Sequence, residues 1–241
     1  MLGFLRFEVR RLLRDRRYVI FTIALPLGIY LLYTHTGGQD ARVDGTAVAT
    51  YLMVSMAAYG AMGGAIGAIG GRLAAERASG WVRQLRATPL PAHGYVTVKV
   101  LAALLLALPA VLLVALTGAL VNGVHLEAAR WAELIGLLWI GTLPFAALGI
   151  LLGYLLESSS AQPVMVGVYM ALAVLGGLWA PLDSLPAGMR TLAHALPSYH
   201  FADLGWRTVA GAAPNATDAL ALAGWAVLFG ALALWRYRAV R

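Results

Sequence analysis

The 241-residue sequence contains no cysteine and few charged residues, and both absences restrict what the protein can be. Without cysteine, disulfide bonds and thiolate metal sites are excluded. Charged residues make up 12% of the chain, against about 25% in a soluble domain. Hydrophobic residues reach 61%, against about 45–50%. A chain of this composition cannot cover its own surface with polar side chains.

The apolar residues are gathered into six runs long enough to cross a hydrocarbon core, which takes about 20 helical residues. These runs cover residues 18–34, 46–71, 96–121, 131–156, 163–180 and 219–235. We therefore predict an all-α polytopic membrane protein with six transmembrane helices, forming a single domain over residues 1–241. The first helix is expected to be kinked near Pro26.

The segment of residues 1–17 carries six arginines, with its aliphatic side chains spaced on one side of a helix. This pattern favours an amphipathic helix on the inner membrane surface, and a disordered basic leader is the alternative. A secretory signal peptide fits less well, because the next apolar run exceeds the usual h-region of about 7–15 residues.

Basic residues accumulate on the cytoplasmic side of membrane proteins. Fourteen of the eighteen Lys and Arg residues lie in the N-terminal segment, the loop after the second run and the C-terminal tail, and four lie on the other side. Both termini are therefore predicted to be cytoplasmic, and the arginine-rich composition favours a bacterial cytoplasmic membrane. The net charge of +7 is explained by topology, so no nucleic-acid partner is expected.

The chain lacks the motifs that would let it drive chemistry or transport alone. Ionisable residues are missing from the interiors of the six runs, which disfavours proton or sodium coupling. The only lysine, Lys99, follows Val98, so no P-loop can bind ATP. Zinc-protease and nucleophile-elbow motifs are absent, and the five histidines lack ligand spacing. We predict no catalytic residue, no metal site and no cofactor on this chain.

The polar stretch of residues 76–99 interrupts two long apolar runs. Residues 76–86 can form a short helix with Trp81, Val82 and Leu85 toward one side, ended by the Thr88-Pro89-Leu90-Pro91 sequence. A short amphipathic helix with a basic rim suits a groove in a partner protein. The alternative is an ordinary loop whose arginines only fix the membrane topology. For Glu76 and Lys99, the alternative is that their side chains snorkel to the inner membrane interface.

Two segments resemble the permeases of type-2 ATP-binding-cassette (ABC) exporters. The first resemblance is in the loop, at Glu76, Arg77, Gly80, Leu85, Thr88, Pro89, Leu90 and Lys99. The second follows the fifth run, at Gly176-Gly177, Pro181, Leu185-Pro186 and Leu196-Pro197. The chain departs from the family pattern at Trp81, where a small residue is usual, and at Leu196, where Asn often stands.

The resemblance implies that residues 73–95 form a cytoplasmic coupling loop that docks into a separate ATPase subunit, which binds ATP and Mg²⁺. The residues implied in ATPase coupling are Glu76, Arg77, Gly80, Trp81, Leu85, Thr88, Pro89 and Lys99. Residues 157–162 would be a second, smaller contact, with a bare tight turn as the alternative.

The same resemblance implies that residues 181–218 form short helices that re-enter the outer membrane face before the last span. The exit-gate residues would be Gly177, Pro181, Leu185, Pro186 and Pro197. Two permease copies, identical or related, would meet through their second and fifth spans around a substrate path. Candidate path residues are Tyr51, Met53, Met56, Tyr59, Met165, Tyr169 and Met170, although helix packing is the more common role of such residues.

Two further expectations concern residues outside these motifs. The second run contains glycines at G-x-x-x-G spacings, which let helices approach closely. They would serve either a dimer seam or packing within the chain, and the second is favoured. On the outer side, Asp183, Asp203 and Asp218 are expected to be solvated.

These observations predict the membrane subunit of an ATP-driven exporter that moves a hydrophobic small molecule, such as a drug, an antibiotic or a lipid, across the lipid bilayer. The alternative is a membrane protein that works without an ATPase, as a secondary transporter, a channel or an intramembrane enzyme. An intramembrane enzyme would need a polar catalytic cluster at membrane depth, and the sequence offers none.

Overall fold

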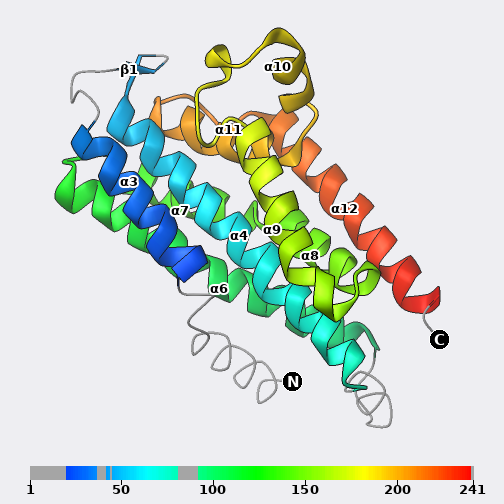
Figure 1. Ribbon diagram of the computed structural model, residues 1–241. Coiled ribbons are helices and arrows are strands. Elements are labelled where there is room, and N and C mark those ends of the chain that lie inside the picture. Colours follow the sequence, from blue (N-terminus) through cyan, green and yellow to red (C-terminus); the bar gives the residue numbers. More distant parts are fainter. Residues whose placement is uncertain (1–19, 37–41, 44, 81–91, 240–241) are drawn as a thin grey trace.

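A computed structural model describes the chain over residues 20–36, 42–43, 45–80 and 92–239, and these residues form a bundle of helices (Figure 1). The elements in chain order are the π-helix η1 (Ile20–Ala24), α3 (Leu25–Thr36), β1 (Arg42–Val43), β2 (Thr46–Ala47), α4 (Val48–Ala78), α6 (Ala92–Val121), α7 (Ala128–Ile140), α8 (Leu143–Leu155), α9 (Ser158–Leu175), the 3₁₀-helix η2 (Leu182–Ser184), α10 (Ala187–Ala193), α11 (Pro197–Val209) and α12 (Ala216–Ala239). β1 and β2 form a two-residue antiparallel hairpin.

The described residues contain five helical stretches that are long and apolar enough to cross a membrane. They are α4, α6 from Val96, α7 with α8, α9, and α12 to Arg238. The first predicted span corresponds to η1 and α3, and its wider π-helical turn ends just before Pro26. The prediction of an all-α polytopic membrane protein is therefore confirmed. The predicted interfacial helix of residues 1–17 lies outside the described residues.

Several helix ends differ from the predicted spans. α4 continues seven residues beyond Gly71, because Leu73 and Ala74 are buried against the rest of the bundle. α9 begins at Ser158, so residues 158–162 are its first turn, and the connection from α8 is only two residues long. The sequence prediction had placed a six-residue turn there.

The fourth predicted span is interrupted. α7 ends at Ile140 and α8 begins at Leu143, with Pro144 in its first turn. At the break, a Cβ added to Gly141 would lie 2.7 Å from the ring of Phe201, so the glycine makes room for that side chain. The break thus lets a residue of α11 enter the bundle between the two halves of one span.

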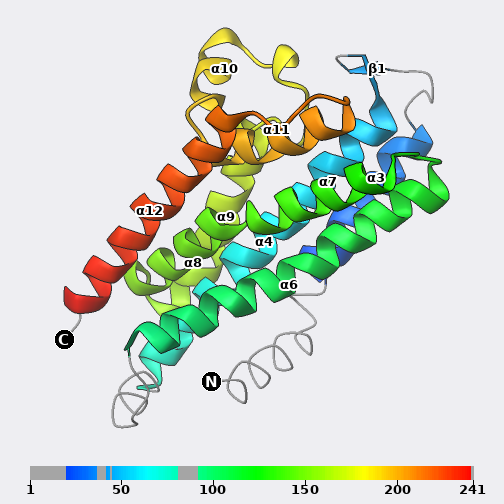
Figure 2. The ribbon, with the colours of Figure 1, turned by 180° about the vertical axis from the view of Figure 1, so that it is seen from behind.

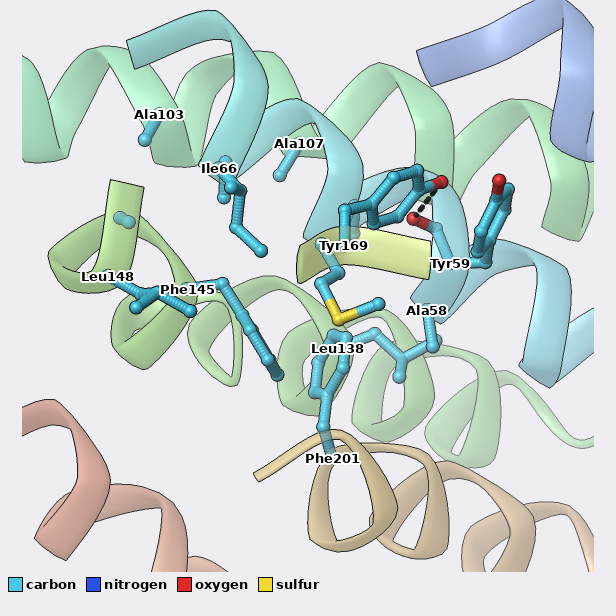
Figure 3. Packing of buried hydrophobic residues seen from close by; sticks show 14 of the residues in the cluster. Ala58, Tyr59, Ile66, Ala103, Ala107, Leu138, Phe145, Leu148, Tyr169 and Phe201 are labelled. Carbon is cyan, nitrogen blue, oxygen red and sulfur yellow. Dashed lines mark hydrogen bonds between the residues drawn. The ribbon is translucent and has the colours of Figure 1, made fainter. Parts of the chain in front are cut away.

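α4 is the central helix, in contact with α3, α6, α8, α9 and α11. Glycines allow α8 to approach it closely: a Cβ on Gly149 would lie 2.8 Å from the carbonyl oxygen of Ile66. The buried side chains around this contact include Phe145, Leu148 and Phe201 (Figure 3). Most of α12 is exposed and apolar, as expected for a helix that faces lipid.

The bundle has two distinct ends. The short helices η2, α10 and α11 lie together at one end, which we call the short-helix end (Figures 1 and 2). The last turns of α4, α8 and α12 lie at the other, which we call the basic end. Among the described residues, it carries Arg72, Arg77, Lys99, Arg236 and Arg238.

Candidate functional site

At the basic end, an ion pair joins α4 to α6. The Nζ of Lys99 donates a hydrogen bond to Glu76 Oε1 at 3.0 Å. The two residues are 1% and 6% exposed, respectively. Lys99 therefore lies inside the bundle in contact with Glu76, whereas a snorkelling lysine would extend its ammonium group to the membrane surface. A buried charge is costly unless it is paired, so this contact fixes the two helices side by side.

The adjacent residue, Arg77, joins α4 to α8. Its Nη1 donates to the carbonyl oxygens of Gly153 at 2.9 Å and Tyr154 at 2.7 Å. These carbonyls belong to the last turn of α8, where helix carbonyls lack partners within the helix and the helix dipole favours a cation. The guanidinium carbon also lies 5.7 Å from the centre of the Tyr154 ring.

The Tyr154 ring extends this contact to α12, because it meets the ring of Tyr237 edge to face at 5.7 Å between centroids. Four helices, α4, α6, α8 and α12, are thus connected through two consecutive residues, Glu76 and Arg77. We call the set of Glu76, Arg77, Lys99, Tyr154 and Tyr237 the basic-end cluster.

α4 ends immediately after this cluster. The N–H groups of Ser79 and Gly80 bond to carbonyl oxygens of the last turn, and Gly80 has φ +75°, which favours glycine. Residues 76–78 therefore belong to α4, which corrects the prediction that a separate short helix begins at Glu76. Of the predicted coupling residues, Glu76, Arg77, Gly80 and Lys99 lie at this end, and Trp81, Leu85, Thr88 and Pro89 lie outside the described residues.

The predicted substrate-path residues lie mostly inside the bundle. Tyr59 and Tyr169 stack with ring centroids 4.5 Å apart, and the Tyr169 hydroxyl donates to the Tyr59 carbonyl oxygen at 3.1 Å (Figure 3). The Tyr59 hydroxyl donates to Met170 Sδ at 3.5 Å. Met170 is half-buried, and six of the seven residues are buried within this one chain: Tyr51, Met53, Met56, Tyr59, Met165 and Tyr169.

The predicted exit-gate prolines each open one of the short helices. Pro181 and Pro186 precede η2 and α10, and Pro197 is the first residue of α11, where its missing N–H needs no partner. Leu185 follows η2 directly. Gly177 has φ +80° and lies in the turn that follows the end of α9 at Leu175. The segment of residues 181–218 thus contains the short helices η2, α10 and α11, and its re-entry into the membrane and its role as an exit gate stay predictions.

The short-helix end is tied to α4 by an aromatic contact that sequence reasoning missed. Tyr51 stacks on Trp206 with centroids 4.7 Å apart and an interplanar angle of 11°. The Tyr51 hydroxyl donates to the Gly177 carbonyl oxygen at 3.2 Å, and Trp206 Nε1 donates to Ser55 Oγ at 3.0 Å. The available signal was the Tyr51-x-x-x-Ser55 spacing, which places both groups on one face of α4.

The carboxylates at the short-helix end are also less solvated than predicted. Asp218 is 3% exposed, and its Oδ1 lies 2.6 Å from His200 Nδ1. Asp203 is half-buried, and burial together with the neighbouring Asp218 carboxylate raises its pKa to about 6. Asp183 alone is solvated as expected, and it lies 3.6 Å from Arg190.

Asp203 is part of the wall of a cavity of about 530 Å³ at the short-helix end. Its floor is formed by buried and half-buried residues of α4 and α11, among them Tyr51, Tyr199 and Trp206. Its rim is formed by exposed residues of η2 and α10, among them Asp183 and Arg190. In the described ranges, no three His, Cys, Asp or Glu side chains are grouped to hold a metal ion.

A helical bundle with five membrane-length stretches, a basic end and a short-helix end defines a polytopic membrane protein. Residues 34–235 match the model of the ABC-2 family transporter proteins. The chain is also 33% identical over 224 residues to the Bacillus subtilis (strain 168) protein named "Putative transport permease YvfS", covering 92% of this chain and 90% of that one. The chain belongs to the ABC-2 transporter family, as a non-catalytic membrane permease subunit that works with an ATPase subunit.

Proposed function

We propose that the protein exports a hydrophobic small molecule, as a dimer whose basic end faces the cytoplasm and receives the ATPase subunits. The permease name of the Bacillus subtilis relative supports a transport role. The orientation is supported by the positive charges gathered at the basic end. The substrate class, the dimer and the direction of transport are inferences from the sequence resemblance described above.

The observation that carries the proposal is the basic-end cluster. The loop of residues 79–91 connects α4 to α6, and the Glu76–Lys99 pair joins these two helices directly beside it. Arg77 passes any displacement of the α4 end to α8. A force on the loop therefore acts on a rigid group of helices instead of deforming one helix end.

The coupling step follows from this arrangement. ATP binding closes the ATPase dimer, and the loop follows the ATPase surface on which it rests. Because the cluster connects α4, α6, α8 and α12 to one another, we expect these four helices to move together relative to α9. Linkage requires the ATPase to bind the two permease conformations with different affinities.

Copurification tests the partner. The permease, tagged on this chain alone, is expressed with a candidate ABC ATPase and purified in detergent. Leu85→Asp is expected to abolish copurification of the ATPase, whereas Leu192→Asp, on the exposed face of α10 at the other end, is expected to leave it intact. Equal copurification with both variants would contradict docking at the loop.

Cysteine labelling tests the orientation. Because the sequence contains no native cysteine, only the introduced cysteine can be labelled. Ser79→Cys at the basic end and Ala187→Cys in α10 are both at exposed positions. In intact cells, a membrane-impermeant maleimide is expected to label the second and not the first, with both labelled after lysis. The reverse pattern would place the basic end outside.

A further inference from the structure

We propose that the cavity at the short-helix end is a binding site for an organic ammonium cation, held between aromatic rings and the Asp203 carboxylate. The site does not depend on which side of the membrane this end faces. If the proposed orientation is correct, the cation binds at the outer surface of the permease.

The volume and the position of the cavity fit a small-molecule site. Its volume of about 530 Å³ lies within the range of about 300–1,000 Å³ typical of such sites. The floor is formed by buried and half-buried residues and the rim by exposed ones, so a ligand can enter from outside the bundle. The cavity lies at one end of the bundle, between the first turn of α4 at Tyr51 and the short helices η2, α10 and α11.

Aromatic rings determine the chemistry of the floor. Tyr51, Tyr199 and Trp206 all contribute to the cavity wall. The faces of tyrosine and tryptophan rings carry negative partial charge and attract cations, most strongly when the cation is shielded from water. The rings are also fixed: Tyr51 and Trp206 stack on each other, and the Tyr199 ring meets His194 edge to face at 4.5 Å.

The charged residues of the wall favour a cation for a second reason. Arg190 and Asp183 form an ion pair at the rim, where their charges offset one another. The remaining carboxylate of the wall is Asp203, on the same helix as Tyr199 and Trp206. An anion would have to approach this carboxylate, whereas a cation gains from the carboxylate and from the aromatic rings of the same wall.

The state of Asp203 agrees with this role. Burial and the Asp218 carboxylate raise the pKa of Asp203 to about 6, and Arg207 and His200 act in the opposite direction. Near neutral pH the carboxylate is therefore ionised but poorly compensated. A bound ammonium group would supply the compensating positive charge.

Isothermal titration calorimetry on the full-length chain in lipid nanodiscs tests the proposal, with choline as the probe. The control ligand is 3,3-dimethyl-1-butanol, which has the same shape with a neutral carbon in place of the ammonium nitrogen. Choline is expected to bind at least about tenfold more tightly than the neutral compound, as an ion pair and a cation–π contact require. Equal affinities, or no binding of either compound, would overturn the proposal.

Variants locate the site. Asp203→Asn is expected to weaken choline binding about tenfold, whereas Glu127→Gln, which removes an exposed carboxylate from the N-terminus of α7, leaves it unchanged. Tyr199→Phe keeps the ring and is expected to retain binding, and Tyr199→Leu is expected to lose it. Wild-type affinity in Asp203→Asn would place the cation elsewhere.

The ATPase is absent from this experiment, so the outcome is independent of the docking proposal. Failure of choline to bind leaves copurification with the ATPase unaffected, and failure of copurification leaves the cation site unaffected. The comparison of choline with its neutral counterpart uses the wild-type chain, so it stays decisive even if a variant does not fold.

Discussion

Lys99 Nζ lies 3.0 Å from Glu76 Oε1, and both side chains are buried where α4 and α6 approach the loop that connects them. Removing one member leaves the other charge buried. Lys99→Met is therefore expected to destabilise the protein by about 3–5 kcal/mol, seen as a lower unfolding temperature in detergent.

The double variant separates stability from coupling. Replacing both Glu76 and Lys99 by Met removes both charges and keeps the volume, and is expected to restore most of the lost stability. If the pair also transmits force, the double variant will fold but show ATP hydrolysis poorly linked to transport. Full transport in the stable double variant would show that the pair serves folding alone.

Arg77 is expected to be sensitive to a change that keeps its charge. Arg77→Lys retains the cation but cannot hold the two carbonyl oxygens of Gly153 and Tyr154 in the same planar geometry. We expect a loss of about 1.5–3 kcal/mol, the range for a hydrogen bond to a charged group, measured by thermal unfolding. Arg236→Lys at the same end is the matched control, and an equal loss there would argue against a specific role for Arg77.

The glycines of the bundle fall into two groups that alanine substitution distinguishes. A Cβ on Gly149 meets backbone atoms of Ala65 and Ile66 at 2.8–3.0 Å, and a backbone cannot rotate away. Gly149→Ala is expected to cost about 1–3 kcal/mol through overpacking. Gly67 has no neighbour within 4 Å of such a Cβ, so Gly67→Ala is expected to keep or raise stability, by up to about 1 kcal/mol of helix propensity.

The Gly67→Ala variant also tests whether the glycines of the second span form a dimer seam. Gly60, Gly63 and Gly70 meet side chains or backbone of other helices of this chain, which supports packing within the protomer. If Gly67→Ala leaves the protomer stable but separates the proposed dimer in crosslinking, the open part of α4 belongs to the seam. A stable, fully dimeric variant would exclude Gly67 from it.

The raised pKa of Asp203 predicts that the stability of the folded protein falls with rising pH over a defined range. Its pKa is raised to about 6 from an ordinary value of 3.8, so the folded protein binds the proton more tightly than the unfolded chain. Its contribution to stability is therefore greatest below about pH 4 and is lost as the pH rises to about 6. Asp203→Asn removes this contribution, so the variant is expected to gain on the wild type in thermal stability between these pH values.

Other groups face Asp203 and must be considered in that measurement. They are Asp218 from α12, and His200, Arg207 and Tyr199 from α11. Tyr199 has its pKa raised to about 12, mainly by burial, and stays neutral throughout. Asp203→Asn retains His200 and Asp218, so the difference between variant and wild type reports the Asp203 proton together with its coupling to these neighbours. A difference independent of pH would contradict the assignment.

The helical fold was predictable because its signal is local. Runs of about twenty apolar residues indicate the spans, and the family pattern of prolines indicated short helices between the fifth and sixth spans. The break between α7 and α8 was missed, although Gly141 and Pro144 mark it in the sequence. Its cause is a residue of a later helix, Phe201, which no window around Gly141 contains.

The candidate sites were predictable only in part, for the same reason. The family pattern found Glu76, Arg77 and Lys99, yet the partners of Arg77 are backbone carbonyls of α8, which carry no sequence signal. Asp203 and Asp218 were expected in solvent because they lie in the segment predicted to be outside the membrane, between the fifth and sixth spans. Their burial comes from the packing of α11 against α12, two consecutive helices whose contact the local sequence pattern does not show.

The buried pair of Glu76 and Lys99 has a consequence for how the protein is made. The two residues lie 23 positions apart, so the carboxylate at the end of α4 reaches the insertion machinery before the lysine of α6. A charge costs about 2.5–3.5 kcal/mol at the centre of an inserting helix and less near its end, and pairing with Lys99 offsets that cost for Glu76. We expect α4 to remain at the insertion machinery until α6 arrives, so that the two helices enter the bilayer as a hairpin.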